Sequence, residues 1–169
     1  LALERLRGMP WALADRTDDP LCRQRLERPT PRLALGTALA GLAHAAIDLS
    51  DGLAGDLGHI LAASGVGAEI EQAALPVAPA VQALPEAYRL ECLLHGGDDY
   101  ELLFTAPASA REAVGRAAQA SGTPVQRIGR ITPDGGLRLR GPDGRVQALT
   151  ARGFDHFAPG AALGPAPVS

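Results

Sequence analysis

The segment at residues 48–52 reads DLSDG, and its two aspartates have the spacing of a magnesium site. Magnesium prefers hard oxygen ligands, takes one or two carboxylates and keeps several waters. If the segment joins a strand to a helix, Asp48 and Asp51 can converge on one ion, and the helix amino terminus favours phosphate. Ser50 can donate to a phosphate oxygen, and Gly52 lets the backbone come close. The alternative is that Asp51 only caps the helix.

A second acidic segment, HGGDDYE, occupies residues 95–101. Its two glycines predict a flexible loop that presents Asp98 and Asp99 at the edge of a strand over residues 100–105. These acids can bind a cation or a cationic ligand ring. The alternative is a solvated acidic turn, with Tyr100 serving only as a core residue of the strand.

A third segment, GFDHF at residues 153–157, gathers two aromatic residues in a chain with only 4% aromatics. The face of Phe154 or Phe157 can stack on a planar ligand, especially a cationic one. The alternative is a hydrophobic plug that closes the sheet.

Local patterns predict the elements that hold these segments. Residues 45–49 and 66–71 have the composition of short strands, and a helix between them ends at Gly65. Its apolar face has helical spacing: Leu53, Leu57, Ile60 and Leu61. This order predicts an α+β fold, an α/β sandwich with a mixed sheet and flanking helices. We expect further helices at 33–42 and 107–120, a strand at 125–131, and a hairpin pairing 137–139 with 146–149.

Composition excludes several classes of function. A net charge of −3 provides no general attraction to nucleic acid, and no apolar run approaches the ~18 residues of a membrane span. Cys22 and Cys92 have no metal-ligand spacing and are expected to be free thiols in a reducing cytoplasm. The sequence has no G-x-x-x-x-G-K-[ST] loop, no glycine loop of protein kinases and no convincing nucleophile.

Taken together, four segments in this order resemble the thiamine-monophosphate kinases. They are RPTPR at 28–32, AIDLSDGL with its helix at 46–60, GGDDYELLFT at 96–105 and GFDHF at 153–157. The second of these is shared more loosely with aminoimidazole ribotide synthetase and selenophosphate synthetase, whereas the glycine–acid–tyrosine strand is more specific. The resemblance implies ATP-dependent phosphorylation of thiamine monophosphate to the diphosphate.

The resemblance also implies roles for particular residues. Asp48 and Asp51 would ligate magnesium, and Ser50 would contact a phosphate of ATP. In-line attack of the substrate phosphate on the γ-phosphoryl group requires positioning and charge screening, and no catalytic protein nucleophile is expected.

On the substrate side, the resemblance places the acid at Asp98 against thiamine monophosphate and an aromatic residue, Phe154 or else Phe157, on its ring. The family usually has Glu where this chain has Asp98. Because Asp is one methylene shorter, the contact is direct, bridged by water, or shifted to Asp99.

The expected organisation is an interdomain helical segment at 1–30, a carboxy-terminal kinase domain at 31–157 and a flexible tail at 158–169. An amino-terminal ATP-binding domain would precede residue 1, so we expect this chain alone to be inactive. The longer protein is expected to be a cytoplasmic homodimer. Two alternatives are a non-catalytic binding or assembly module of the same fold, and another ATP-dependent synthetase of the superfamily. The retained DLSDG acids argue against the first, and the YELLFT strand argues against the second.

Overall fold

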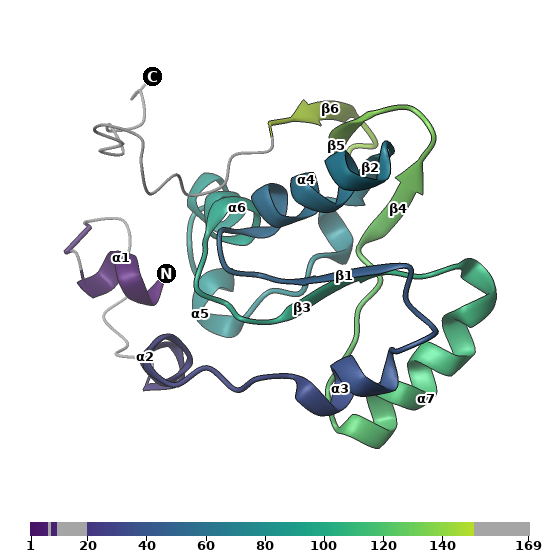
Figure 1. Cartoon of the computed structure of the whole chain (residues 1–169). Coiled ribbons are helices and arrows are strands. Elements are labelled where there is room, and N and C mark those ends of the chain that lie inside the picture. Colours follow the sequence, from purple (N-terminus) through teal and green to yellow (C-terminus); the bar gives the residue numbers. More distant parts are fainter. Residues whose placement is uncertain (7, 10–19, 151–169) are drawn as a thin grey trace.

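A two-stranded ribbon and a four-stranded sheet organise the computed structural model, which describes residues 1–6, 8–9 and 20–150 (Figure 1). The ribbon pairs β1 (Ala45–Asp48) with β3 (Leu102–Thr105) in antiparallel fashion. In the larger sheet, β2 runs parallel to β5 and antiparallel to β4, so the sheet is mixed, as the sequence predicts. Its strands in spatial order are β4 (Gly129–Thr132), β2 (Gly67–Glu71), β5 (Gly136–Arg140) and β6 (Val146–Leu149).

Helix α4 (Leu53–Ser64) lies between the ribbon and the larger sheet and carries the centre of the core (Figure 1). Its apolar side chains pack against residues of both sheets and of α6 (Glu86–His95). The helix ends as expected at Gly65, whose φ of 65° is left-handed and suits a residue without a Cβ. The core contributors outside α4 include Ala68, Ile70, Leu94, Leu103, Leu137 and Leu139.

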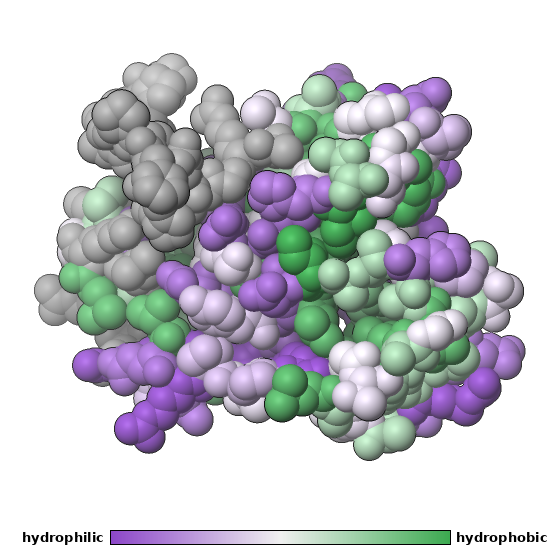
Figure 2. All heavy atoms as spheres, in the orientation of Figure 1, coloured by the Kyte–Doolittle hydropathy of each residue, from purple (hydrophilic) through white to green (hydrophobic). Residues whose placement is uncertain are grey.

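A second, smaller core joins α3 (Leu33–Ala38) to α7 (Arg111–Ser121). Leu35, Leu39 and Ala117 are buried there. Figure 2 shows pale green, weakly apolar atoms gathered over these two helices. The remaining helical pieces are α1 (Ala2–Leu6), α2 (Pro20–Glu27), η2 (Gln72–Ala74), α5 (Pro79–Gln82) and η3 (Ala108–Ala110).

The buried carboxylate of Glu69, on β2, links three of the four strands of the larger sheet. It accepts two hydrogen bonds from Arg140 on β5, at 2.9 and 3.0 Å, and Arg130 on β4 lies 3.2 Å away. A buried charge is tolerated only when it is paired and hydrogen-bonded, and here one acid is bound from both neighbouring strands.

Several predicted boundaries are wrong. The helix predicted from residue 107 begins at Arg111, after the 3-10 turn η3. The strand predicted from Tyr100 begins at Leu102, because Tyr100 has a φ of 50°, which an extended strand cannot adopt. The strand predicted from residue 125 begins at Gly129, and the helix predicted through residue 42 ends at Ala38. The segment at 153–157 and the tail at 158–169 lie outside the described residues.

Candidate functional site

The two acidic segments, far apart in the sequence, are joined by backbone hydrogen bonds at the end of the β1–β3 ribbon. The amide of Leu49 donates to the carbonyl of Glu101, and the amide of Tyr100 donates to the carbonyl of Leu49, both at 2.8 Å. The amide of Asp98 donates to the carbonyl of Ser50 at 2.9 Å. The sequence predicts each segment separately, and the tertiary structure makes them two sides of one site.

Glycines allow this close approach. A Cβ on Gly97 would lie 2.4 Å from the carbonyl oxygen of Ser50. A Cβ on Gly52 would lie 2.9 to 3.0 Å from backbone atoms of His95, and the φ of Gly52 is 104°. Both distances are too short for a side chain, so the two segments can pack together only with glycine at these positions.

Asp48 and Asp51 lie on either side of the turn from β1 into α4, the first exposed and the second half-buried. Within the described residues, neither carboxylate has a hydrogen-bond or ion-pair partner. The pKa of the Tyr100 phenol is raised, chiefly by Asp98, and to a smaller extent by desolvation and by Asp48 and Asp51.

Tyr100 is 40% exposed, so the alternative in which it is only a core residue of the strand is wrong. Its hydroxyl donates to Asp98 at 3.2 Å. Both residues have left-handed backbones, with φ values of 64° at Asp98 and 50° at Tyr100. Such conformations cost free energy outside glycine and occur often at functional sites. They turn the Asp98 and Tyr100 side chains toward each other.

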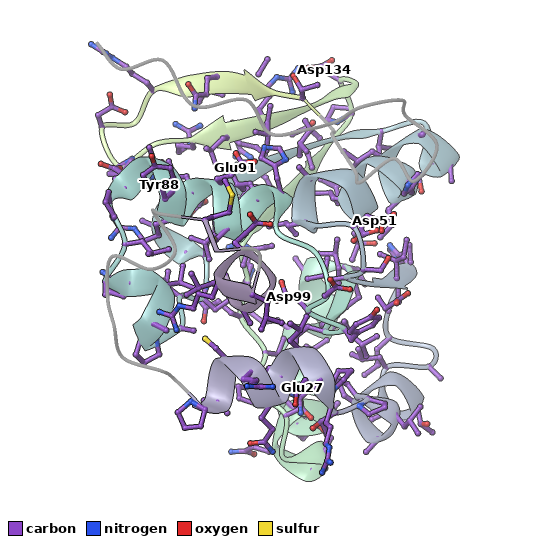
Figure 3. The ribbon with its side chains drawn as sticks, turned by 90° about the vertical axis from the view of Figure 1, so that its left-hand side faces the viewer. Glu27, Asp51, Tyr88, Glu91, Asp99 and Asp134 are labelled. Carbon is purple, nitrogen blue, oxygen red and sulfur yellow. The ribbon has the colours of Figure 1, made fainter. Side chains whose placement is uncertain are left out.

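The neighbouring acid Asp99 lies in a different environment. Its pKa is raised mainly by desolvation of the carboxyl, although the residue as a whole is exposed, and the chain's amino-terminal charge and Arg25 on α2 partly offset the shift. Figure 3 shows Asp99 beside α1, whereas Asp51 lies near α4. Asp98 thus bonds to Tyr100 and to the backbone of the DLSDG segment, whereas Asp99 lies near the charges of the amino terminus and of Arg25.

Glu101, the last acid of its segment, is fully engaged by arginines. Arg32 donates two hydrogen bonds to its carboxylate, at 2.7 and 2.8 Å, and Arg25 also contacts it. Arg32 belongs to the RPTPR segment, so this cluster connects that segment to the site loop. Arg-carboxylate forks are strong and geometrically specific. Sequence reasoning identified the RPTPR segment but did not predict its partner.

Asp56 is a further residue that sequence reasoning missed. It lies in the first turn of α4 and is only 2% exposed. Its Oδ2 accepts hydrogen bonds from the amides of Ser50 and Asp51, at 3.0 and 3.1 Å. The available signal was a charged residue between apolar positions of an otherwise buried helix.

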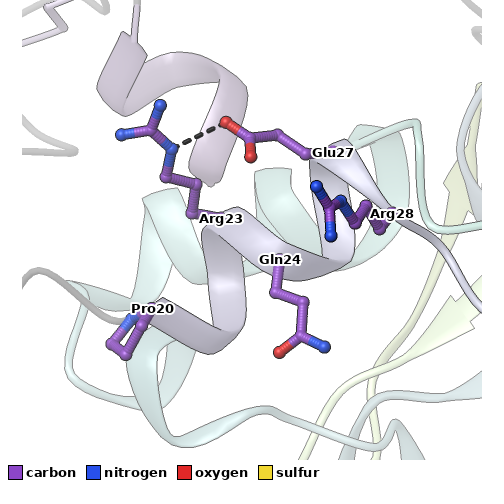
Figure 4. Close-up of a pocket in the computed structure, with 5 residues that line it drawn as sticks. All are labelled: Pro20, Arg23, Gln24, Glu27 and Arg28. Carbon is purple, nitrogen blue, oxygen red and sulfur yellow. Dashed lines mark hydrogen bonds and ion pairs between the residues drawn. The ribbon is translucent and has the colours of Figure 1, made fainter.

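A surface depression along α2 is lined by Pro20, Arg23, Gln24, Glu27 and Arg28, none of which is a predicted site residue (Figure 4). Across the described ranges, no three His, Cys, Asp or Glu side chains are grouped so as to hold a metal, and no helix is long and apolar enough to cross a membrane. Phe154 and Phe157 lie outside the described residues.

This fold and its paired acidic loops define a known class. Residues 11–142 match the family described as AIR synthase related protein, C-terminal domain, and the chain belongs to that family. More particularly, it is 43% identical over 148 residues to thiamine-monophosphate kinase of Salmonella typhimurium. The matched region covers 86% of this chain and 45% of that protein. The resemblance seen in the sequence is therefore confirmed.

Solved structures agree. The crystal structure of thiamine-monophosphate kinase from Stenotrophomonas maltophilia K279a has a TM-score of 0.73 and 43% identity, covering 85% of this chain and 46% of that one. AaThiL complexed with AMPPCP and TMP has a TM-score of 0.72 and 30% identity, covering 92% of this chain and 47% of that one. The chain thus spans about half the length of the relatives that it matches.

Proposed function

We propose that this chain is the carboxy-terminal part of a kinase that transfers the γ-phosphoryl group of ATP to thiamine monophosphate, forming thiamine diphosphate. Relatives named thiamine-monophosphate kinase support it, as does the related structure that contains AMPPCP and TMP. The observation that carries the proposal is that the backbones of the DLSDG and GGDDYE segments are hydrogen-bonded into one site.

Asp48 and Asp51 are the proposed ligands of Mg²⁺. They fit this ion because both carboxylates lie at the turn from β1 into α4 and neither has a partner in the described chain. Two carboxylates are also the usual protein contribution to such a site, because magnesium retains water and binds phosphate oxygens. Bound magnesium would screen the repulsion between two anionic reactants. Ser50, between the aspartates, is the proposed donor to ATP phosphate.

On the other side of the site, Asp98 is the proposed contact to the cationic thiamine moiety. Its carboxylate accepts from Tyr100, which leaves further lone pairs for a ligand. Asp99 remains a second candidate, and Phe154 or Phe157 is the proposed ring contact. No protein nucleophile is required, because the attacking group is the phosphate of the substrate.

The other proposals concern the longer protein. The curated relatives have about twice the matched length, so we propose that an upstream domain completes the ATP site. Segment 1–30 would connect the domains, and 31–157 would form the carboxy-terminal one. A homodimer in the cytoplasm is proposed for the complete enzyme.

The decisive experiment compares Asp48→Asn and Asp51→Asn with a matched control, Asp134→Asn, in the polypeptide extended by the upstream half. Asp134 lies between β4 and β5, far from Asp51 in Figure 3. Thiamine diphosphate formed from ATP and thiamine monophosphate is measured by chromatography. We expect each site variant to lose about 100-fold or more in rate, because a charged carboxylate ligand of the metal is replaced by a neutral amide. The control should retain the full rate. Full activity in both site variants would refute the metal assignment, and no activity in the parent would favour a non-catalytic module.

A further inference from the structure

The loop between β1 and α4 is held from inside by a carboxylate of the helix that follows it. Both of the amides that Asp56 binds, those of Ser50 and Asp51, belong to residues of the proposed ligand site. The amide of Asp56 itself donates to the carbonyl of Gly52 at 2.9 Å, closing the first turn of the helix. Residues 52–57 are all buried, so the carboxylate lies beneath the loop.

Burying a carboxylate is costly unless hydrogen bonds and nearby positive charge compensate it. Here the two loop amides supply hydrogen bonds, and the amino end of α4 supplies the positive end of the helix dipole. In this arrangement the amides of Ser50 and Asp51 point inward to Asp56. They are not free to bind phosphate, contrary to the simplest expectation for a loop at a helix amino terminus.

We propose that Asp56 is a positioning residue of this site, which holds the loop so that the side chains of Asp48, Ser50 and Asp51 face the ligand while two loop amides face inward. The proposal rests on the proposed function for the identity of the ligand. Recognition of phosphate at this loop then depends on the metal and the Ser50 hydroxyl and not on the amides of Ser50 and Asp51. The loop conformation would be set before any ligand binds, because Asp56 belongs to the central helix.

A merely structural role is the alternative, and Glu69 provides the comparison. Both acids are buried, with 2% exposure for Asp56 and 7% for Glu69. Asp56 accepts two hydrogen bonds from backbone amides, and Glu69 accepts two from the Arg140 guanidinium. Glu69 holds strands together, whereas Asp56 holds the loop that carries the proposed ligands. If Asp56 only stabilised the fold, its substitution and that of Glu69 would affect the DLSDG loop equally.

The first arm of the test uses this chain and amide-resolved hydrogen exchange by NMR. We expect Asp56→Asn to speed exchange at Ser50 and Asp51 by at least about tenfold, since a neutral amide oxygen is a weaker acceptor than a carboxylate. Exchange at Ile70 on β2 should change little. Glu69→Gln should leave Ser50 and Asp51 as in the parent. Equal exchange at Ser50 and Asp51 in the parent and in Asp56→Asn would overturn the proposal.

The second arm measures rates in the extended polypeptide over a range of Mg²⁺ concentrations. We expect Asp56→Asn to raise the Mg²⁺ concentration for half-maximal rate by about fivefold or more, with little change in KM for thiamine monophosphate. Glu69→Gln should leave both values unchanged even where it lowers the melting temperature. An unaltered Mg²⁺ dependence in Asp56→Asn also overturns the proposal. If the parent shows no kinase activity, the proposed function fails, and the exchange arm still decides whether Asp56 holds the loop.

Discussion

The carbonyl of Ser50 accepts a hydrogen bond from the amide of Asp98 at 2.9 Å. This single bond links the residue proposed to contact ATP with the residue proposed to contact the substrate. Two neighbouring backbone bonds, between Leu49 and residues 100 and 101, extend the link into the β1–β3 ribbon. Because phosphoryl transfer depends on the mutual placement of two bound reactants, a rigid connection between their two loops is directly useful.

The connection predicts a strong effect of a small substitution. Gly97→Ala introduces a Cβ 2.4 Å from the carbonyl oxygen of Ser50, which forces the loops apart. We expect a loss of about 1–3 kcal/mol in the free energy of unfolding, measured with urea. Gly115→Ala is the matched control, because it lies within α7 and its added Cβ meets nothing within 4 Å. The control should gain up to about 1 kcal/mol. Equal effects of the two substitutions would show that the loops are not in close contact.

The arginine cluster at Glu101 predicts that a partly buried ion pair contributes more to the free energy of unfolding than an exposed one. Glu101→Gln weakens hydrogen bonds from Arg32, and the two side chains are only 33% and 21% exposed. We expect a loss of about 1–2 kcal/mol in unfolding free energy. Glu112→Gln, the control, removes a pair with Arg116 that spans 3.9 Å and is largely exposed, and it should cost under about 0.5 kcal/mol. A Glu101→Gln protein as stable as the control would mean that the cluster does not form in solution.

The hydrogen bond between Tyr100 and Asp98 predicts a change in titration. The pKa of the Tyr100 phenol is raised above its ordinary value chiefly by the charge of Asp98, which also accepts its hydrogen bond. Both effects favour the neutral phenol, so Asp98→Asn should lower the pKa of Tyr100. Absorbance at alkaline pH measures this shift in a Tyr88→Phe background, where Tyr100 is the remaining tyrosine. An unchanged pKa would indicate that the two side chains are apart in solution.

The raised pKa of Cys92 predicts slow alkylation of this thiol in the folded chain. Neither Cys22 nor Cys92 forms a disulfide within the described residues. Desolvation is the main reason that the pKa of Cys92 is raised. Because the thiolate is the reactive form, Cys92 in the folded chain should react slowly with iodoacetamide near pH 7.5, and faster as pH rises or in urea. Peptide mass spectrometry measures the rate, with the urea-unfolded chain as the control. A rate at pH 7.5 equal to that of the unfolded chain would contradict the partial burial of Cys92.

Local sequence patterns were sufficient for the elements that carry the proposed magnesium ligands. The strand before Asp48, the helix from Leu53 and its end at Gly65 depend on hydrophobic spacing and on glycine chemistry within a few residues. Such interactions are short in range, so they are readable from the chain alone. The resemblance of the acidic segments to a known family indicated the family of this chain, and the comparison with known proteins confirms it.

Tertiary structure alone decided how those elements combine into a site. The sequence was sufficient to place Asp98 and Asp99 in an acidic loop that follows two glycines. The hydrogen bond from Tyr100 to Asp98, between two residues with left-handed backbones, is seen only in the tertiary structure. The pairing of Glu101 with Arg32 and the burial of Asp56 under the DLSDG loop were likewise settled by the packing. The physical reason is that contacts distant along the chain, and strained dihedral angles, depend on the whole fold, whereas helices, strands and turns depend largely on neighbouring residues.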